Sequence, residues 1–390
     1  MQQDIFIDAL DVVSPRGNQA FGQPGEHAAA QLMPWPSVMA GAVRSAVLTY
    51  NGYSSASAIK QLVSDQGALA QQLSLPGANT MEQSFRLGYF GLAQRSGGSV
   101  KQLVPLPADV VVTGTIRQPV IQRLLPQVLP DGVTTSSESA QLPVLRADTA
   151  SKALSGLWLN ASGWQQYCTG EVLNAGHLVA THELVARRHS VGIGMDSSLR
   201  RVNEGQLYTA ERLELKNNTG YWARLHYMPE ALPDSTLLRF GGDGHAARVT
   251  HAQVTLPALT PKQIKQHKRF AIVLWSPALF GSGGVPDGID DTGRWQHESF
   301  NAQLVCSVLS RPQVISGWDL AKQRPKPARA FVPAGSVYWF DQFEGDAEAL
   351  IAFANNGLWH NDTAADEQRL VEGFNRFQLV AWSGNRNKGN

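Results

Sequence analysis

Cysteine is scarce in this chain of 390 residues, and long apolar runs are absent. The two cysteines, Cys168 and Cys306, have no C-x-x-C spacing, which indicates a reducing compartment. The N-terminus lacks the basic start and the apolar core of a signal peptide. The most apolar stretch, Phe270 to Phe280, is too short to cross a bilayer. We therefore expect a cytoplasmic protein that makes no membrane contact.

Recognisable catalytic motifs are missing as well. The chain has no H-E-x-x-H and no G-x-S-x-G, and no glycine in its glycine-rich loop precedes a lysine as in a Walker motif. Gly242 to Ala247 spells G-x-G-x-x-A, but a strand-like sequence follows it and no acid occurs between Asp243 and Asp287. Both features exclude a dinucleotide fold. A single Asp243 is too few carboxylates for the two metal ions of a nucleotidyl cyclase or polymerase. These motifs therefore predict no cofactor and no metal.

Acidic residues are absent from long stretches, although the net charge is only +1. This absence leaves three clusters of positive charge. Such clusters favour contact with RNA or DNA on one face, and the alternative is an ordinary solvated surface. The clusters are Arg248, Lys262, Lys265, Lys268 and Arg269; Lys322, Arg324, Lys326 and Arg329; and Arg187, Arg188, Arg200 and Arg201.

The abundant turn formers predict a mixed fold. With 36 glycines and 21 prolines, an α+β structure is favoured over a helical bundle, and the length allows two domains. A boundary near Pro257 divides the chain into residues 1–258 and 259–390. The order of predicted elements is compatible with a ferredoxin-like half on each side. Residues 113–175 resist assignment, and their polar stretches suggest a mobile insertion.

A helix is predicted from Pro36, because proline suits the first helical turn and apolar residues recur on one side up to Tyr50. Ser37, Gly41 and Arg44 follow a different side at helical spacing. Two small residues there would let a phosphate come close to Arg44. Packing of the helix against a strand would explain Ser37 and Gly41 equally well.

The most suggestive stretch is the glycine-rich loop within Leu237–Val249. Glycine lets a backbone or a ligand approach closely, and successive amides in such a turn can bind a phosphate oxygen. The flanking arginines would add charge. The alternative is a hairpin turn that binds nothing. The residues concerned are Arg239, Gly241, Gly242, Gly244, His245 and Arg248.

A basic hairpin or finger is predicted at about residues 187–206, with an ordinary surface loop as the alternative. Residues 207–215 alternate like a strand, and Tyr221 to Met228 is expected to return beside them as a hairpin partner. Trp222, Arg224 and His226 would then share one face. That face suits base stacking, although a covering helix explains it as well.

Taken together, the motifs resemble a known family, the RAMP proteins of type III-B CRISPR effectors, and specifically the third subunit of the Cmr complex. The resemblance runs from about residue 36 to 382. It is carried by Pro36-Ser37-x-x-x-Gly41-x-x-Arg44, Val191-Gly192-Ile193, Glu204 to Glu211, Phe240 to Gly244, Gly317-Trp318-Asp319, Val332 to Val337 and Gly373-Phe374.

The resemblance implies two ferredoxin-like (RRM-like) domains and a non-catalytic subunit for antiviral defence. Such a subunit binds the 5′ handle of the guide RNA (crRNA), docks on the large polymerase/cyclase-like subunit and adjoins the RAMP backbone subunits. We assign phosphate contacts to Arg44, Arg239 and Arg248, and close backbone approach to the loop glycines. Finger contacts fall to Arg187, Arg188, Arg200 and Arg201, and a second patch comprises Trp318, Lys322 and Arg324.

The competing function is a metal-independent RAMP endoribonuclease that processes the guide precursor. Such cleavage needs a base for the 2′-hydroxyl and an acid for the leaving oxygen. Ten histidines are present, and His189, His226 and His245 lie near the proposed RNA-binding segments. The sequence cannot place two of them around one phosphate.

Overall fold

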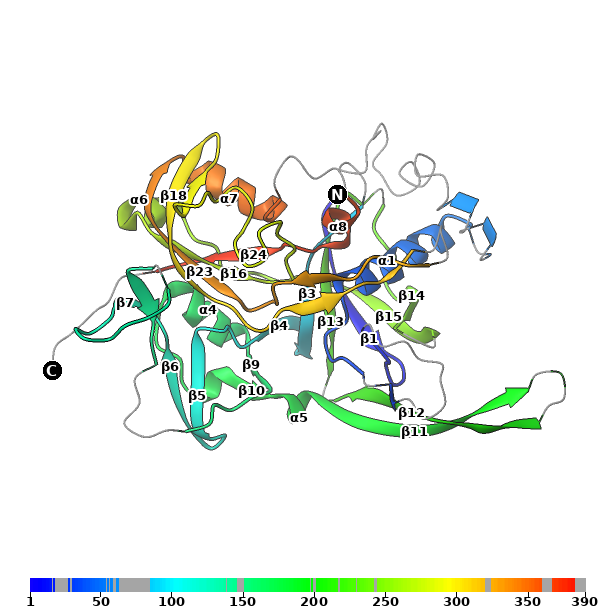
Figure 1. The fold of residues 1–390 in the computed structure, drawn as a ribbon. Helices are drawn as coiled ribbons and strands as arrows, with labels where there is room; N and C mark the ends of the chain where they lie inside the picture. The colour runs from blue at the N-terminus through cyan, green and yellow to red at the C-terminus, as the bar shows by residue number, and fades with distance from the viewer. Residues whose placement is uncertain are drawn as a thin grey trace.

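The structure is a computed structural model. It describes the chain apart from residues 16, 18–26, 29, 54, 56, 59–60, 63–84, 138, 146–150, 197, 199–200, 217, 229, 242–243, 320–323, 360–366 and 383–390. The fold is mixed α+β with several antiparallel sheets, which confirms the predicted class (Figure 1).

An eight-stranded sheet organises the first half of the chain. Helix α1 (Pro36–Tyr50) covers one face of it, where Met39, Val43 and Val47 pack against Ile5 and Ile7. The helix thus begins and ends where its sequence predicts. The strands are, in spatial order, β10 (Leu178–Ala180), β9 (Leu157–Leu159), β4 (Ser99–Pro105), β3 (Arg86–Ser96), β13 (Thr219–His226), β1 (Gln3–Ala9), β15 (His245–Ala252) and β14 (Leu237–Phe240).

A five-stranded sheet forms the second half. Its aromatic core includes Phe270, Phe340 and Phe377, and helix α7 (Ala347–Asn356) packs on it. Asp346 caps this helix by accepting a hydrogen bond from the Glu348 amide. The strands are β17 (Arg294–Gln296), β18 (Phe300–Val308), β23 (Val337–Gly345), β16 (Phe270–Leu274) and β24 (Phe377–Val380); helices α6 (Pro261–His267) and α8 (Glu367–Glu372) complete this half.

Both sheets contain the same antiparallel order of four strands. In chain order these are the second, third, first and fourth strands: β3-β13-β1-β15 in one half and β18-β23-β16-β24 in the other. This is the order that a ferredoxin-like domain requires. In the described residues, however, no helix precedes β15 in the first half or β18 in the second where that fold needs one. The ferredoxin-like assignment therefore stays a prediction.

The segment 113–175, which the sequence could not place, carries regular structure. Its hairpins are β5 (Val110–Thr115) with β6 (Gln118–Arg123) and β7 (Pro126–Val128) with β8 (Gln141–Pro143); α4 (Ala161–Thr169), η2 (Ala175–His177) and α5 (Thr181–Leu184) follow. Trp164 and Tyr167 of α4 pack against Val273, Trp339 and Val380 of the five-stranded sheet. These residues therefore connect the two halves of the molecule through a common core.

Two long strands, β11 (Val185–Asp196) and β12 (Arg201–Leu215), form a hairpin that projects far from the body (Figure 1). We call this hairpin the finger. The short β2 (His27–Ala28) pairs with β12 near the finger's root. The predicted pairing of residues 207–215 with 221–228 is wrong, because β12 belongs to the finger whereas β13 lies between β1 and β3.

The predicted open face on β13 is closed. Trp222 is fully buried against Trp275 of the second half, and Arg224 forms an ion pair with Asp4 at 2.8 Å. The covering element is thus neither a base nor a helix but a segment of the second half. No described helix is long and apolar enough to span a membrane.

Candidate nucleic-acid interface

Ser37, Gly41 and Arg44 lie at helical spacing on α1, and Gly41 is exposed. Apart from its chain neighbours and the nearby backbone of α1 itself, no described heavy atom lies within 4 Å of a Cβ built on Gly41. Packing of the helix therefore does not account for this glycine, which costs about 0.5–1 kcal/mol relative to alanine inside a helix. An open, side-chain-free position beside Arg44 suits a ligand that approaches the helix closely.

The Arg44 guanidinium has buried donors without partners in the described structure. Its Nε and Nη2 are shielded from solvent and have no hydrogen-bond partner among the described residues. Its Cζ lies 5.6 Å from the centre of the Phe85 ring. Burial lowers the pKa of Arg44 below its ordinary value, and the carboxylate of Glu372 opposes this shift only in part.

Glu372 at the end of α8 is shared by several cations. Its side chain is 5% exposed and forms an ion pair of 2.6 Å with Lys326 Nζ and one of 3.7 Å with Arg369 Nη1. Glu372 also acts electrostatically on Arg44. Among the described residues, this group of Arg44, Lys326, Arg369 and Glu372, which we call the junction cluster, therefore holds three cations and one carboxylate, and buried charge is costly unless it is paired.

Lys326 brings a segment of the second half to α1. It lies between β21 and β22 in a ribbon of short strands, in which β19 (Gln313–Ile315) pairs with β22 (Arg329–Phe331) and β20 (Trp318–Asp319) pairs with β21 (Arg324–Pro325). Ile315 and Phe331 of the ribbon pack with Phe374, and Trp35 at the start of α1 packs against them. The structure therefore joins two predicted sites, the α1 face and the patch with exposed Trp318 and Arg324, at one junction. Lys322 lies outside the described residues.

The glycine loop is the turn of the β14–β15 hairpin, as the simpler interpretation predicted. Gly241 has a positive φ of 78°, and a Cβ there would meet the Ser14 and Pro15 backbone at 3.2–3.4 Å. Local geometry thus explains this glycine without a ligand. Gly244 is exposed with φ 65°, and Gly242 lies outside the described residues.

Arg239 and Arg248 are exposed but are not grouped with Arg44. They alternate with Leu238, Phe240, Ala247 and Val249, whose buried side chains belong to the core under α1. Because successive strand residues point to opposite faces, both arginines lie on the face of the sheet away from that helix. The structure therefore separates the three predicted phosphate contacts into two surfaces.

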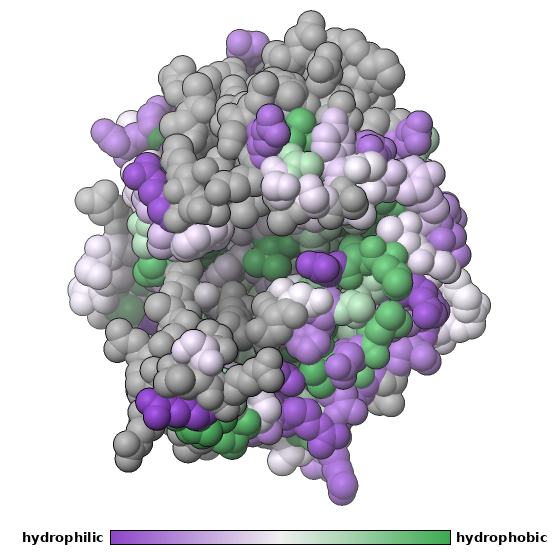
Figure 2. All heavy atoms as spheres, turned by 90° about the vertical axis from the view of Figure 1, so that its right-hand side faces the viewer, coloured by the Kyte–Doolittle hydropathy of each residue, from purple (hydrophilic) through white to green (hydrophobic). Residues whose placement is uncertain are grey.

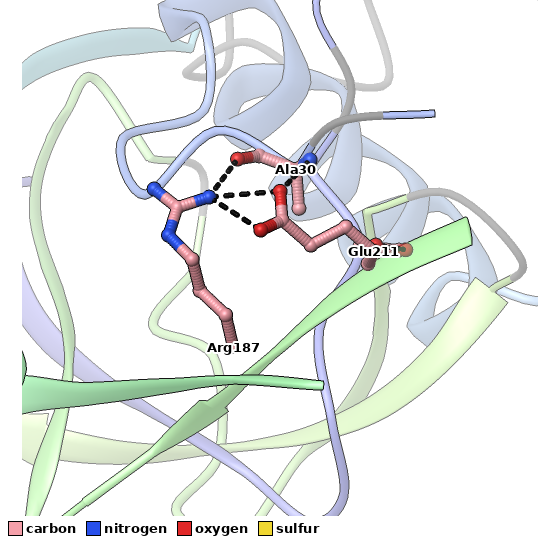
Figure 3. Close-up of polar contacts among 4 residues, drawn as sticks. Ala30, Arg187 and Glu211 are labelled. Atoms are coloured by element: carbon pink, nitrogen blue, oxygen red, sulfur yellow. Dashed lines mark hydrogen bonds and ion pairs between the residues drawn. The ribbon is translucent and has the colours of Figure 1, made fainter. Parts of the chain in front are cut away.

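Arg187 at the root of the finger is already paired. Its Nη1 donates to both carboxylate oxygens of Glu211 at 2.8 Å and lies 3.4 Å from the Ala30 carbonyl oxygen (Figure 3). The Ala30 amide donates to the same carboxylate at 2.9 Å. Burial raises the pKa of Glu211, but these hydrogen bonds outweigh it and lower that pKa below its ordinary value. This ion pair, which we call the root clamp, ties the finger to the segment before α1.

Further along the finger, Arg188 pairs with Glu214 at 2.5 Å, whereas Arg201 near the tip is exposed and Arg200 lies outside the described residues. Val191, Ile193 and Met195 occupy alternate positions of β11 and are exposed, as is Val202.

Figure 2 shows the side toward which the finger projects, where apolar residues gather beside a hollow and hydrophilic residues line the surface below and to the right of it.

The histidines of the endoribonuclease hypothesis lie apart. His226 lies beside the start of β1 and His245 beyond its other end, about 30 Å away at about 3.3 Å per residue. His189 belongs to the finger. Burial and then the charges of Arg376, Arg224 and Arg86 lower the pKa of His226 to about 4; His245 Nδ1 lies 3.9 Å from Asp11. In the described residues, no three His, Cys, Asp or Glu side chains group as metal ligands.

Sequence reasoning did not select the residues that complete the junction cluster. Lys326 belonged to a noted basic cluster, but nothing distinguished it from its neighbours. Arg369 and Glu372 lie on α8, a six-residue helix too short for a periodic signal. Their role depends on contacts with α1 and the ribbon, which a local pattern does not contain.

Comparison with known proteins gives two results. A family model described as CRISPR-associated protein (Cas_Cmr3) matches residues 5–382. A chain in a cryo-EM structure of the type III-B Cmr-beta bound to cognate target RNA is similar over 96% of both chains, with 14% identity and a TM-score of 0.51. A second, from the same assembly with target RNA and AMPPnP, gives 14% identity, 96% coverage of both chains and a TM-score of 0.50. None of the curated proteins compared with the sequence matches it.

Proposed function

This chain belongs to the Cmr3 family of CRISPR-associated proteins, and from that premise we propose that it holds the 5′ handle of the guide RNA in a type III-B effector complex. It does so without cleaving the RNA. Its proposed domains are ferredoxin-like and meet near residue 258, with the junction cluster between them.

The junction cluster carries this proposal. Lys326 and Arg369 pair with Glu372 there, and two shielded guanidinium nitrogens of Arg44 have no hydrogen-bond partner in the described structure. A phosphate would supply the missing negative charge, and arginine–phosphate hydrogen bonds are among the strongest in proteins. The exposed Gly41 leaves room for the RNA backbone to approach α1. A single-stranded handle, with its phosphates accessible and its bases unstacked, matches this surface.

The other exposed features suit neighbours in the complex. The apolar row on the finger has no covering partner in the described part of the chain, and exposed apolar rows commonly mark interaction sites. We assign this row to the adjoining RAMP subunits. The surface of Arg239 and Arg248, on the opposite face of the sheet, remains for a second stretch of guide RNA or for docking on the large polymerase/cyclase-like subunit.

Crosslinking of the assembled complex with guide RNA tests the proposal. We expect handle nucleotides to crosslink to peptides from residues 36–50 and 311–331. Crosslinks confined to peptides outside both ranges would contradict it. Incubation of the pure protein with repeat RNA is the second arm, and cleavage that a His245→Ala variant loses would favour the endoribonuclease instead.

A further inference from the structure

Trp318 is the most unusual exposed residue of the ribbon. Its side chain is 58% exposed, although tryptophan is among the side chains that gain most from burial. It belongs to none of the hydrophobic clusters of the described residues and stacks on no described aromatic ring. The ribbon thus presents a large aromatic surface that nothing in the described chain covers.

The backbone around Trp318 is fixed next to the junction cluster. The Lys326 amide donates to the Gly317 carbonyl oxygen at 2.9 Å, and Ser316 Oγ donates to the Lys326 carbonyl oxygen at 2.6 Å. Lys326 itself is held by Glu372. Arg369 Nη2 donates to the Ser316 carbonyl oxygen at 3.1 Å. Trp318 is therefore positioned by the same residues that form the proposed phosphate site, one residue beyond Gly317.

The ribbon carries an excess of positive charge, which favours a negatively charged partner. Residues 311–331 contain five cations, Arg311, Lys322, Arg324, Lys326 and Arg329, and one acid, Asp319. Arg324 and Arg329 are exposed on β21 and β22. An aromatic platform surrounded by cations is the combination that single-stranded nucleic acids use, with a base on the ring and phosphates on the charges.

We infer that Trp318 is the stacking platform for one nucleobase of the bound RNA, adjacent to the phosphate at the junction cluster. This inference rests on the proposed function, because it requires the handle at that junction. It makes the two sequence-predicted patches parts of one binding surface. Stacking on an indole face tolerates any base, so Trp318 fixes the register of the RNA without reading its sequence.

The test uses the assembled complex with guide RNAs that carry 2-aminopurine at successive handle positions. Stacking quenches this fluorescent base, so one position should be quenched in the wild type and brighten in Trp318→Leu. Trp318→Phe keeps an aromatic face and should retain most of the quenching. Trp318→Leu should also weaken guide binding about 5- to 100-fold. Val172→Ala, at another strongly exposed apolar position, is the matched control and should change neither signal.

Two outcomes separate the hypotheses. If Arg44→Ala weakens guide binding but no 2-aminopurine position responds to Trp318→Leu, the stacking platform is refuted and the proposed function stands. If neither Arg44→Ala nor Trp318→Leu changes guide binding or the fluorescence at any handle position, the stacking platform and the proposed function are both refuted. Loss of another protein subunit from the Trp318→Leu complex, with RNA fluorescence unchanged, would assign Trp318 to a protein contact and also overturn the inference.

Discussion

The junction and the root of the finger use arginine in opposite ways. At the finger root, Arg187 donates to both carboxylate oxygens of the buried Glu211. At the junction, two shielded nitrogens of Arg44 have no partner among the described residues, and Glu372, whose charge acts on Arg44, is paired with Lys326. The sequence marked both arginines as RNA contacts. Only the contacts of each side chain distinguish an arginine whose donors are satisfied within the fold from one whose donors lack partners.

The difference also concerns what each region needs. The finger projects from the body and is anchored through its root, where β12 meets Val13, Ala30 and β2. A satisfied ion pair there fixes its direction. The junction lies between the two halves, where a bound anion would supply partners to an unsatisfied cluster. The arginine with satisfied donors and the arginine proposed to bind RNA therefore occupy separate regions of this protein.

Substitution of Arg44 should have the largest effect on binding. Arg44→Ala removes a charge-assisted hydrogen bond to phosphate, worth about 1.5–3 kcal/mol, so guide affinity should fall by about 10- to 100-fold. The slope of log affinity against log salt concentration should also become shallower by the amount that one phosphate contact contributes. Filter binding across a salt series measures both. Arg294→Ala, which breaks a pair with the exposed Glu344, is the control, and an equal loss in that variant would remove the distinction between paired and unpaired arginines.

Substitution of Arg187 should instead affect stability. Arg187→Ala leaves the buried Glu211 carboxylate with the Ala30 amide as a donor, and an unsatisfied buried group costs about 1–3 kcal/mol. We expect the lower part of this range, because the Arg187 side chain is half exposed. Denaturant unfolding measures the loss, and guide affinity of the folded protein should stay close to that of the wild type.

A double-substitution cycle makes this second prediction specific. The double variant Arg187→Ala/Glu211→Gln should lose less free energy of unfolding than the two single variants lose together, because it no longer contains the carboxylate that Arg187 neutralises. Strict additivity would mean that the pair does not stabilise the finger. A strong loss of guide affinity in folded Arg187→Ala would show that this arginine binds RNA as well.

The sequence predicted the parts of the fold that local patterns determine. Helix α1 begins at Pro36, and the glycine loop joins two strands. It failed where pairing is non-local: β12 and β13 follow each other in the chain but belong to different sheets. The candidate site was predicted to the same extent: local patterns selected Arg44 and Trp318, each from its own segment, but did not show that they meet. Their common junction depends on Glu372, whose partners come from three separate regions.

Substitution of Gly41 should have a smaller effect, which raises stability but weakens guide binding. Gly41→Ala should raise the free energy of unfolding by about 0.5–1 kcal/mol, because alanine favours the helix and meets no described atom. The added methyl group should weaken guide binding if RNA approaches α1 there. Thermal unfolding and filter binding on the same sample measure the two effects. Thr49→Ala, at another exposed position of α1, is the control. Unchanged affinity in Gly41→Ala would place the RNA away from this face.

The smallest predicted effect is the contribution of the root clamp to the pH dependence of stability. Because hydrogen bonding lowers the pKa of Glu211 below its ordinary value of 4.5, its stabilising contribution is complete above that value. The contribution is lost as pH falls through the lower folded pKa. The stability gap between the wild type and Glu211→Gln should therefore narrow below about pH 4.5. Urea unfolding at pH 4 and pH 7 measures this gap. A gap that widens on acidification would mean that Glu211 is protonated in the folded protein, in which case the clamp is not ionic and the contrast with Arg44 disappears.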